Sequence, residues 1–403
     1  MKTLKDFNFK NKRVLVRCDF NVPFDEKGGI GDDFRIKQSL PTIEYLKKKG
    51  AKIILISHLG RPKGKEKKYS LKPVSLRLEQ LLEQKVHRAH NGLSALVKFL
   101  DDCLGEKVKK EIENMKAGEV FLLENLRFYE EEEQNKENFA KALSELADIY
   151  INDGFGACHR AHASVAGIPK YLPSGAGFLL EKEVKILSKV LENPWRPLIM
   201  VIGGVKISTK IKVIENFLKT ADHLLLGGEI ANAVLELKGI LIGKGLPESS
   251  EVMRKIEKIN LTNPRLHLPI DGVISLADVE RGLEEGYIRQ SAPGIVKREE
   301  GFYDIGPETI KIFSEIIKEA KMIIWSGPLG MYEKEQFEKG TKEIAKTIAR
   351  NYSAFKIVGG GDLISALNKF NLLDKFDHVS TGGGAMLEFL SGEKLPGIEA
   401  LSK

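Results

Sequence analysis

The sequence has few cysteines, and their spacing forms no framework. Its 403 residues include Cys18, Cys103 and Cys158, an odd number with no CxxC pair. This excludes a disulfide-stapled scaffold and a cysteine-rich zinc module, and it is typical of a reducing compartment. We therefore expect a cytoplasmic protein.

Long hydrophobic runs are also absent. The longest, such as 197–202, fall far below the roughly 18 residues that a membrane-spanning helix needs. The opening residues, MKTLKDFNFKNKR, lack the apolar region of a secretory signal peptide. These absences predict a soluble protein with no membrane partner.

A strong excess of one charge is missing as well. The 63 basic residues nearly balance the 56 acidic ones, which leaves a net charge of +7. This balance permits an anionic ligand but does not demand nucleic acid. The charged stretches 63–68 and 130–133 are expected to be solvated surface. Since no aromatic residues interleave with the lysine run, we expect no nucleic-acid partner.

Two common nucleotide-binding fingerprints do not occur. There is no GxxxxGK[ST] segment, which excludes a P-loop enzyme. No G-x-G pair is followed by a glycine three residues later, so the dinucleotide fingerprint is missing. This weakens one alternative, a nicotinamide-dependent dehydrogenase on a doubly wound fold, which a cofactor absorbance assay would test.

What is present is an ordinary globular composition, 42% hydrophobic and 30% charged, over a length that predicts two large domains. Short apolar runs predict strands at 13–17, 52–57, 120–124, 149–152, 198–203, 223–226, 322–325, 355–358 and 378–380. Amphipathic stretches between them, for example 36–49, 138–147, 181–191 and 336–351, predict helices. This alternation is typical of an α/β fold with parallel sheets covered on both faces. The segment 173–177 (PSGAG) is the candidate connection between the domains.

In the first half, basic and polar residues follow the predicted strands. In open α/β sheets, ligands bind beyond the carboxyl ends of the strands. The residues placed there, or on the adjoining loops, include Arg17, Arg35, Arg61, Arg127, Arg160, His58, His159 and His162. Arginine suits bidentate capture of phosphate or carboxylate, so this pattern predicts a small, densely anionic substrate. Arg17 could instead pair with Asp19 and be structural.

In the second half, glycines follow the strands, at 203–204, 227–228, 327, 359–361 and 382–384. Glycine lets backbone N–H groups approach a phosphate, and a helix N-terminus adds a favourable dipole. Lys206 and Lys210 are spaced to share one helical face and to neutralise a polyphosphate. Asp362 is a natural ligand for Mg²⁺, which needs few protein carboxylates. The pattern predicts a nucleotide-binding surface.

Together these residues form motifs that resemble the phosphoglycerate kinases over nearly the whole chain. The motifs are RCDFNVP (17–23), DDFRI (32–36), LPTI (40–43), SHLGRP (57–62), LLENLRF (122–128), HRAH (159–162), GGVKISTK (203–210), GGGD (359–362) and VSTGGGA (379–385). The resemblance implies reversible phosphoryl transfer from 1,3-bisphosphoglycerate to Mg-ADP, which gives 3-phosphoglycerate and ATP in glycolysis. It also implies two Rossmann-like lobes with a cleft and a hinge, and a monomer.

The resemblance further implies where the ligands bind. The amino lobe, 1–177 plus about 391–403, would hold 3-phosphoglycerate through Asp19, Phe20, Asn21, Arg35, His58, Leu59, Gly60, Arg61, Arg127 and Arg160. The carboxyl lobe, 178–390, would hold ATP or ADP through Lys206, Lys210, Gly306, Glu333, Gly360, Gly361, Asp362 and Leu363. Arg35, Lys206 and Lys210 are the expected catalytic residues, and Asp362 the expected Mg²⁺ ligand.

Four positions depart from the family pattern. Leu363 stands where a threonine or serine is usual, and Ser326 replaces the asparagine of WNGP. Gly154 and Cys158 are expected only to adjust packing. A second alternative, a catalytically weakened paralogue that binds nucleotide or protein partners, rests on Leu363 and Ser326. Turnover would distinguish it from an active kinase.

Overall fold

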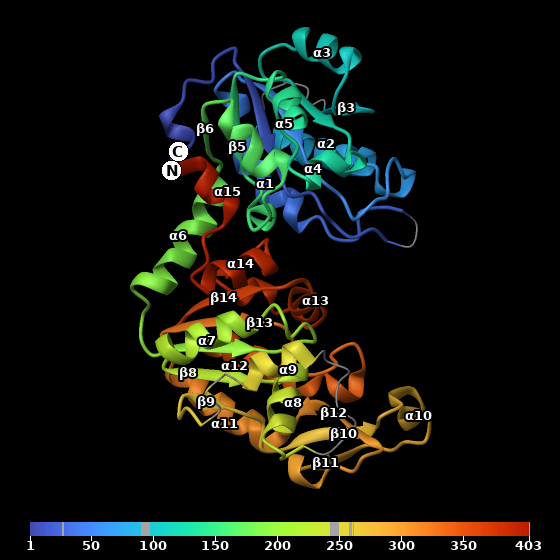
Figure 1. Ribbon diagram of the computed structural model, residues 1–403, viewed down its shortest axis with the longest axis vertical. Helices are drawn as coiled ribbons and strands as arrows, with labels where there is room; N and C mark the ends of the chain where they lie inside the picture. Colours follow the sequence, from blue (N-terminus) through green and yellow to red (C-terminus); the bar gives the residue numbers. More distant parts are fainter. Residues whose placement is uncertain (26–27, 90–96, 242–249, 258–259, 261, 403) are drawn as a thin grey trace. The chain divides into compact units, whose positions relative to one another are not determined.

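The fold comes from a computed structural model, which describes residues 1–25, 28–89, 97–241, 250–257, 260 and 262–402. The chain divides into two compact units, Met1–Ile186 with Lys394–Lys403, and Leu187–Glu393. Each unit is built on its own six-stranded parallel sheet (Figure 1). The expected α/β class, with two lobes that each contain a parallel sheet flanked by helices, is confirmed.

The amino-terminal unit contains one sheet of order β3-β4-β2-β1-β5-β6, and every strand pair is parallel. The strands are β1 (Arg13–Arg17), β2 (Lys52–Ile56), β3 (Val97–Leu100), β4 (Val120–Leu123), β5 (Ile149–Asn152) and β6 (Ser174–Ala176). The helices are α1 (Phe34–Lys48), α2 (Lys72–Ala89), α3 (Glu106–Glu113), α4 (Glu130–Glu133), α5 (Glu137–Ser144), α6 (Phe178–Glu192) and α15 (Pro396–Glu399).

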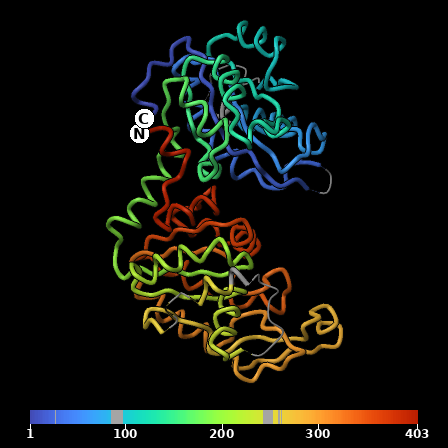
Figure 2. Tube along the Cα trace, in the orientation of Figure 1, coloured from blue at the N-terminus to red at the C-terminus, as the bar shows by residue number. Residues whose placement is uncertain are grey.

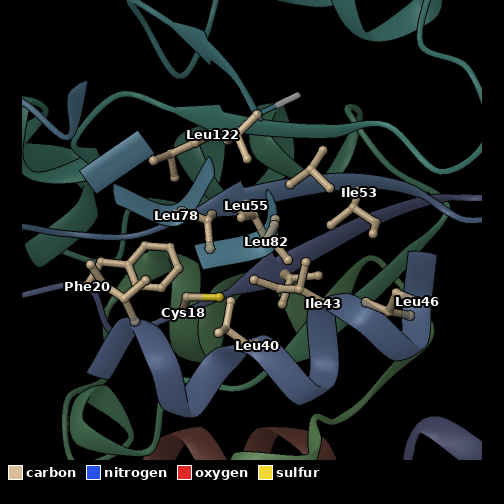
Figure 3. Close-up of a cluster of buried hydrophobic side chains, with 14 of the residues drawn as sticks. Cys18, Phe20, Leu40, Ile43, Leu46, Ile53, Leu55, Leu78, Leu82 and Leu122 are labelled. Atoms are coloured by element: carbon tan, nitrogen blue, oxygen red, sulfur yellow. The ribbon is translucent and has the colours of Figure 1, made fainter. Parts of the chain in front are cut away.

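Helix α1 is held on the sheet by one apolar face. Leu40, Ile43 and Leu46 recur at helical spacing and are buried. They point toward strand residues Ile53 and Leu55 in a core that α2 also enters (Figure 3). Because this packing fixes α1, its first turn is fixed as well, and that turn carries Arg35.

The carboxyl-terminal unit has a second parallel sheet, of order β15-β14-β13-β7-β8-β9. Its strands are β7 (Leu198–Ile202), β8 (His223–Leu226), β9 (Leu266–His267), β13 (Met322–Ser326), β14 (Phe355–Gly359) and β15 (His378–Val379). A small antiparallel sheet adds β10 (Gly272–Leu276), β11 (Arg289–Ser291) and β12 (Glu300–Ile305). The helices are α7 (Ile211–Thr220), α8 (Gly228–Leu237), α9 (Ser250–Glu257), α10 (Val279–Glu284), α11 (Pro307–Glu319), α12 (Lys339–Arg350), α13 (Gly361–Lys369) and α14 (Gly383–Leu390).

The boundary between the units lies inside α6, later than the expected end at residue 177. The segment 173–177 is part of the first sheet and not the connection between the units, because Ser174–Ala176 form β6 and pair with β5. The start of α6 is anchored within the first unit: Phe178 N–H donates to Thr42 Oγ1 (2.9 Å) and Leu179 N–H to Asp153 Oδ1 (2.9 Å). The chain returns to this unit at Lys394, and Gly397 N–H donates to the carbonyl of Cys158 (2.9 Å). Both ends of the chain therefore belong to the first unit (Figure 2).

The sequence did not predict the short strands β3, β6 and β9 or the antiparallel sheet. The missed strands of the parallel sheets are two to four residues long and include the polar sequences SGA and LH, which carry no apolar pattern. In the part of the chain that the structure describes, no helix is long and apolar enough to cross a membrane.

Candidate active site

In the first unit, the loops after β1 and β2 are joined by Arg35 and Asn21. Arg35 Nη1 lies 3.2 Å from Asp19 Oδ2 and donates to the carbonyl of Asn21 (2.9 Å). The Asn21 side chain accepts from Gly60 N–H (2.9 Å). Asp19 is buried and Arg35 is partly exposed, so the carboxylate orients a guanidinium that can still reach a ligand.

Gly60 links this edge to the loop after β4. Its φ is +62°, and an added Cβ would meet the ring of Tyr69, so no other residue fits without strain. Arg127 Nη1 donates to the Gly60 carbonyl (2.7 Å), and Arg127 Nε lies 2.9 Å from Glu133 Oε1. Arg61, which follows Gly60 in the chain, is exposed.

Asn125 organises these loops, although it was not among the predicted site residues. Its side chain accepts from the N–H groups of Leu59 (3.2 Å) and Arg127 (3.0 Å), and it donates to the carbonyls of Leu59 (2.8 Å) and Tyr69 (2.9 Å). Its place in the LLENLRF motif was visible in the sequence. Its role was not, because two of its partners, Leu59 and Tyr69, come from loops far away in the chain.

Two predicted binding residues, Phe20 and Leu59, place their side chains in the hydrophobic core. The Phe20 N–H donates to Ser57 Oγ (2.8 Å), and both backbone polar groups of Leu59 bind Asn125. The structure therefore shows them shaping the loops and presents neither side chain to a ligand.

Beyond β5 lies the HRAH segment. Arg160 Nε donates to His159 Nε2 (3.2 Å), and both residues are partly exposed. His162 is buried, with Nδ1 3.8 Å from Glu132 Oε1. Burial and then Arg127, Arg17 and Arg160 lower the pKa of His162 to about 3, so this histidine is neutral.

Arg17 and His58 are buried at this edge of the first sheet. Arg17 is fully buried, and its Nη2 lies 3.0 Å from His58 Nδ1. Its partners include Ser164 and the Cys18 carbonyl, whereas no ion pair joins it to Asp19 among the described residues, so the expected alternative pairing is not the one formed. Burial, Arg17, Arg127 and Arg35 hold the pKa of His58 well below its usual range. The edge is thus rich in guanidinium charge, which together with burial lowers the pKa of the neighbouring histidines.

The run 130–133 also differs from its expectation as solvated surface. Glu130 and Glu133 are exposed, but Glu132 is fully buried. Burial raises the pKa of Glu132, and Arg17 and Ser164 oppose that rise. One carboxylate of the run is therefore part of the interior beneath the site.

In the second unit, glycines bring three loops together backbone to backbone. A Cβ on Gly203 would lie 2.0 Å from the Pro328 carbonyl oxygen, and one on Gly327 would lie 2.2 Å from the Gly203 carbonyl oxygen. Gly228 has a φ of +58° and touches Gly204 in the same way. Only glycine permits this closeness, and it leaves little side-chain bulk at the edge of the sheet.

Lys210 lies beneath these loops and Lys206 lies outside them. Lys210 is only 6% exposed, and its Nζ would be 3.0 Å from a Cβ on Gly204. Burial lowers the pKa of Lys210 to about 8; Asp362 opposes this effect and Lys206 adds to it. Lys206 is exposed. Because the charges of Asp362 and Lys206 both act on the Lys210 amine, these three residues lie near one another.

The N-terminus of α13 opens to solvent beside them. Gly360 has a φ of +105°, Gly361 has free space around its Cβ position, and Asp362 is exposed in the first turn. Leu363 instead points into the core and is fully buried. The leucine therefore occupies a packing position, and its side chain does not project from the first turn of α13.

Glu333 and Gly306 lie on other segments. Glu333 is exposed on the loop after β13, next to Tyr332. Burial raises the pKa of Tyr332, and the negative charges of Glu333 and Asp362 raise it further. Glu333 and Asp362 therefore both lie near Tyr332. Gly306 is buried at the start of α11, where its N–H donates to the Asp271 carbonyl (2.9 Å).

The residues present fit a magnesium ion carried by a nucleotide. Among the described residues, no group of three or more histidine, cysteine, aspartate or glutamate side chains could hold a metal. Mg²⁺ in phosphate-transfer sites is commonly bound by one or two carboxylates together with phosphates and water. An exposed Asp362 beside Lys210 and a helix N-terminus matches this arrangement.

The comparisons with known proteins cover the whole chain. A family model described as phosphoglycerate kinase matches residues 4–393. The phosphoglycerate kinase of Borrelia garinii subsp. bavariensis is 50% identical over the full length of both chains. That of Dictyoglomus turgidum is 47% identical, over 99% of this chain and 97% of its own.

Solved structures agree with this assignment. The phosphoglycerate kinase from Coxiella burnetii is 38% identical, with a TM-score of 0.82 over 100% of this chain and 98% of that one. That from Pyrococcus horikoshii OT3 is 33% identical, with a TM-score of 0.84 over the same shares. The chain therefore belongs to the phosphoglycerate kinase family, and its activity is the reversible glycolytic transfer of a phosphoryl group from 1,3-bisphosphoglycerate to ADP, giving 3-phosphoglycerate and ATP.

Proposed function

We propose that the first unit binds 3-phosphoglycerate at the carboxyl edge of its sheet. The ligand groups are the side chains of Asp19, Asn21, Arg35, His58, Arg61, Arg127 and Arg160, with the backbone of Gly60. Support comes from the contacts that gather most of these loops around Asn21, Gly60 and Arg127. Guanidinium groups bind carboxylate and phosphate oxygens in pairs, which suits a small ligand that carries both.

The second unit, in this proposal, binds the nucleotide. Lys206 and Lys210 neutralise phosphate oxygens, and backbone N–H groups from Gly360 to Leu363 meet the phosphates at the start of α13. Gly306 and Glu333 complete the nucleotide site. Asp362 holds Mg²⁺ together with the nucleotide phosphates, and the bound ion supplies positive charge that neutralises phosphate oxygens.

The chain's own residues then act mainly by placing charge. Phosphoryl transfer passes through a loose transition state whose charge lies on the equatorial oxygens of the transferred group. Arg35 and Lys206 cradle that group, and Lys210 holds nucleotide phosphate. No general base is required, because the accepting carboxylate is already ionised and the oxygen of ADP is a phosphate oxygen.

The two ligand sets lie in different compact units, so we infer that the units close by hinge motion and bring the reactants into line. The unit boundary inside α6 supports this part of the proposal. Closure would also exclude water from the acyl phosphate. We further propose that the protein acts as a cytoplasmic monomer.

The observation that carries the proposal is the contrast between the two sheet edges, guanidinium groups at one and glycine backbone with lysines at the other. The test is ADP formation from ATP with and without 3-phosphoglycerate and Mg²⁺, coupled to removal of the acyl phosphate. We expect turnover that depends on both additions. Equal turnover without Mg²⁺ would overturn the role of Asp362, and intact turnover in Arg35→Ala and Lys206→Met would overturn the assigned charges.

A further inference from the structure

A buried chain of polar contacts runs from α4 to His58. Glu132 and Arg17 are both fully buried, and Ser164 lies between them. Ser164 donates to Glu132 twice, from its N–H to Oε2 (2.9 Å) and from its hydroxyl to Oε1 (2.5 Å). Arg17 Nε donates to Ser164 Oγ (2.8 Å), and Arg17 Nη2 reaches His58 Nδ1 (3.0 Å).

The direction of every hydrogen bond in this chain is determined by chemistry. The Ser164 hydroxyl has one hydrogen, which it gives to the carboxylate, so its oxygen accepts from Arg17. A guanidinium only donates, and it stays protonated in proteins. His58 Nδ1 must therefore accept, and the hydrogen of the neutral ring is on Nε2.

This arrangement leaves His58 with one free donor. Within the described residues, Nε2 makes no hydrogen bond to the protein, whereas Nδ1 is occupied. The guanidinium can remain buried because Glu132 balances its charge, with Ser164 as the bridge. Without Glu132, the same charge would be buried and uncompensated, and Ser164, the residue that accepts from Arg17, would lose the acceptor that orients its hydroxyl.

We propose that Glu132 is a positioning residue for the glycerate site, which acts through Ser164 and Arg17 to hold His58 as the Nε2–H tautomer. His58 then presents an N–H donor to an oxygen of 3-phosphoglycerate without a charge of its own. This proposal rests on the proposed assignment of His58 to the 3-phosphoglycerate site. It gives a role to one glutamate of the 130–133 run.

The first test needs no substitution. The full-length protein is labelled with ¹⁵N-histidine, and long-range ¹H–¹⁵N correlation spectra identify the tautomer; the His58 signals are assigned by their absence in His58→Gln. We expect a pyridine-type Nδ1 and a pyrrole-type Nε2 at neutral pH. A hydrogen on Nδ1, or a ring with both nitrogens protonated, would overturn the proposal.

The second test compares Glu132→Gln with Glu130→Gln, a matched control in the same helix whose side chain is exposed. In Glu132→Gln we expect mixed tautomers of His58 and a KM for 3-phosphoglycerate raised about tenfold, as for weakening one hydrogen bond to a charged group. The KM for ATP should stay the same. A role in stability alone would lower the melting temperature and leave both the tautomer and the KM ratio unchanged, which would overturn the proposal.

Ser164→Ala keeps both buried charges and removes only the bridge, so it serves if Glu132→Gln does not fold. We expect the same direction of change in tautomer and KM. His58→Gln distinguishes the assignment of His58 to the 3-phosphoglycerate site from the positioning role of Glu132. If it leaves the KM for 3-phosphoglycerate unchanged, the assignment of His58 fails and the positioning role fails with it. If His58→Gln raises that KM but Glu132→Gln and Ser164→Ala do not, only the positioning role is overturned.

Discussion

Lys210→Met should make the protein more stable and much less active. Lys210 is 6% exposed, and burial lowers its pKa from the ordinary 10.5 to about 8. Each pKa unit corresponds to about 1.4 kcal/mol, so the folded state spends at most about 3 kcal/mol to keep this ammonium charged at pH 7. Methionine fills a similar volume without the charge and removes that cost.

The pH dependence follows from the direction of the shift. The folded pKa lies below the unfolded one, so between about pH 8 and 10.5 the unfolded chain binds more protons than the folded chain. The free energy of unfolding of the wild type therefore rises through this range relative to the variant. The advantage of Lys210→Met should be full at pH 7 and should vanish by about pH 10.5.

Differential scanning calorimetry at pH 7 and pH 10 measures this prediction. A gain of about 3 kcal/mol in a unit of this size corresponds to a rise in melting temperature of roughly 6–12 °C as an upper limit. Lys206→Met is the matched control, because Lys206 is exposed and its replacement removes no buried charge. In the coupled assay, Lys210→Met should lower kcat about 10²-fold or more, since it removes a fixed charge that we propose to hold the nucleotide phosphates.

The reasoning would be refuted by a Lys210→Met protein that melts no higher than the wild type at pH 7. It would also be refuted by a stability gain that is unchanged at pH 10, because a burial cost must disappear when the wild-type amine loses its proton. A gain of equal size in Lys206→Met would assign the effect to net charge instead of burial.

Three further predictions concern other parts of the molecule. Arg35→Ala should lower kcat at least about 10²-fold and weaken 3-phosphoglycerate binding far less, as measured by steady-state kinetics and calorimetric titration; equal loss of binding with unchanged kcat would remove its role. Leu363→Thr should reduce the free energy of unfolding by about 1–3 kcal/mol without tightening Mg-ATP binding, because the side chain faces the core; tighter binding would show that it reaches phosphate. Glu300 is fully buried, and donors led by Arg289 outweigh burial to hold its pKa at about 2. Glu300→Gln should therefore cost about 3 kcal/mol at pH 6, and its deficit in denaturant midpoint should shrink as pH falls below 4.5 toward 2; a constant deficit at low pH would argue against the ion pair.

The sequence by itself determined the α/β class with two parallel-sheet lobes and showed which residue types follow the predicted strands. Buried parallel strands are continuous apolar runs, so β1 and β8 were located to the residue. To predict that the arginines gather at one sheet edge and the glycines at another, we needed only the rule that the carboxyl ends of parallel strands meet at one edge of a sheet. These signals are local, because each depends on a few consecutive residues.

Tertiary structure alone decided which polar residues are buried and what they bind. Glu132 and its exposed neighbour Glu130 have the same side chain, and what distinguishes them is the burial of Glu132 and its hydrogen bonds from Ser164, which is distant in the chain and itself accepts from Arg17. The same holds for Phe20 and Leu363, which the sequence predicted to bind ligands but whose side chains face the core. Burial depends on packing between elements far apart in sequence, and no local pattern encodes that packing.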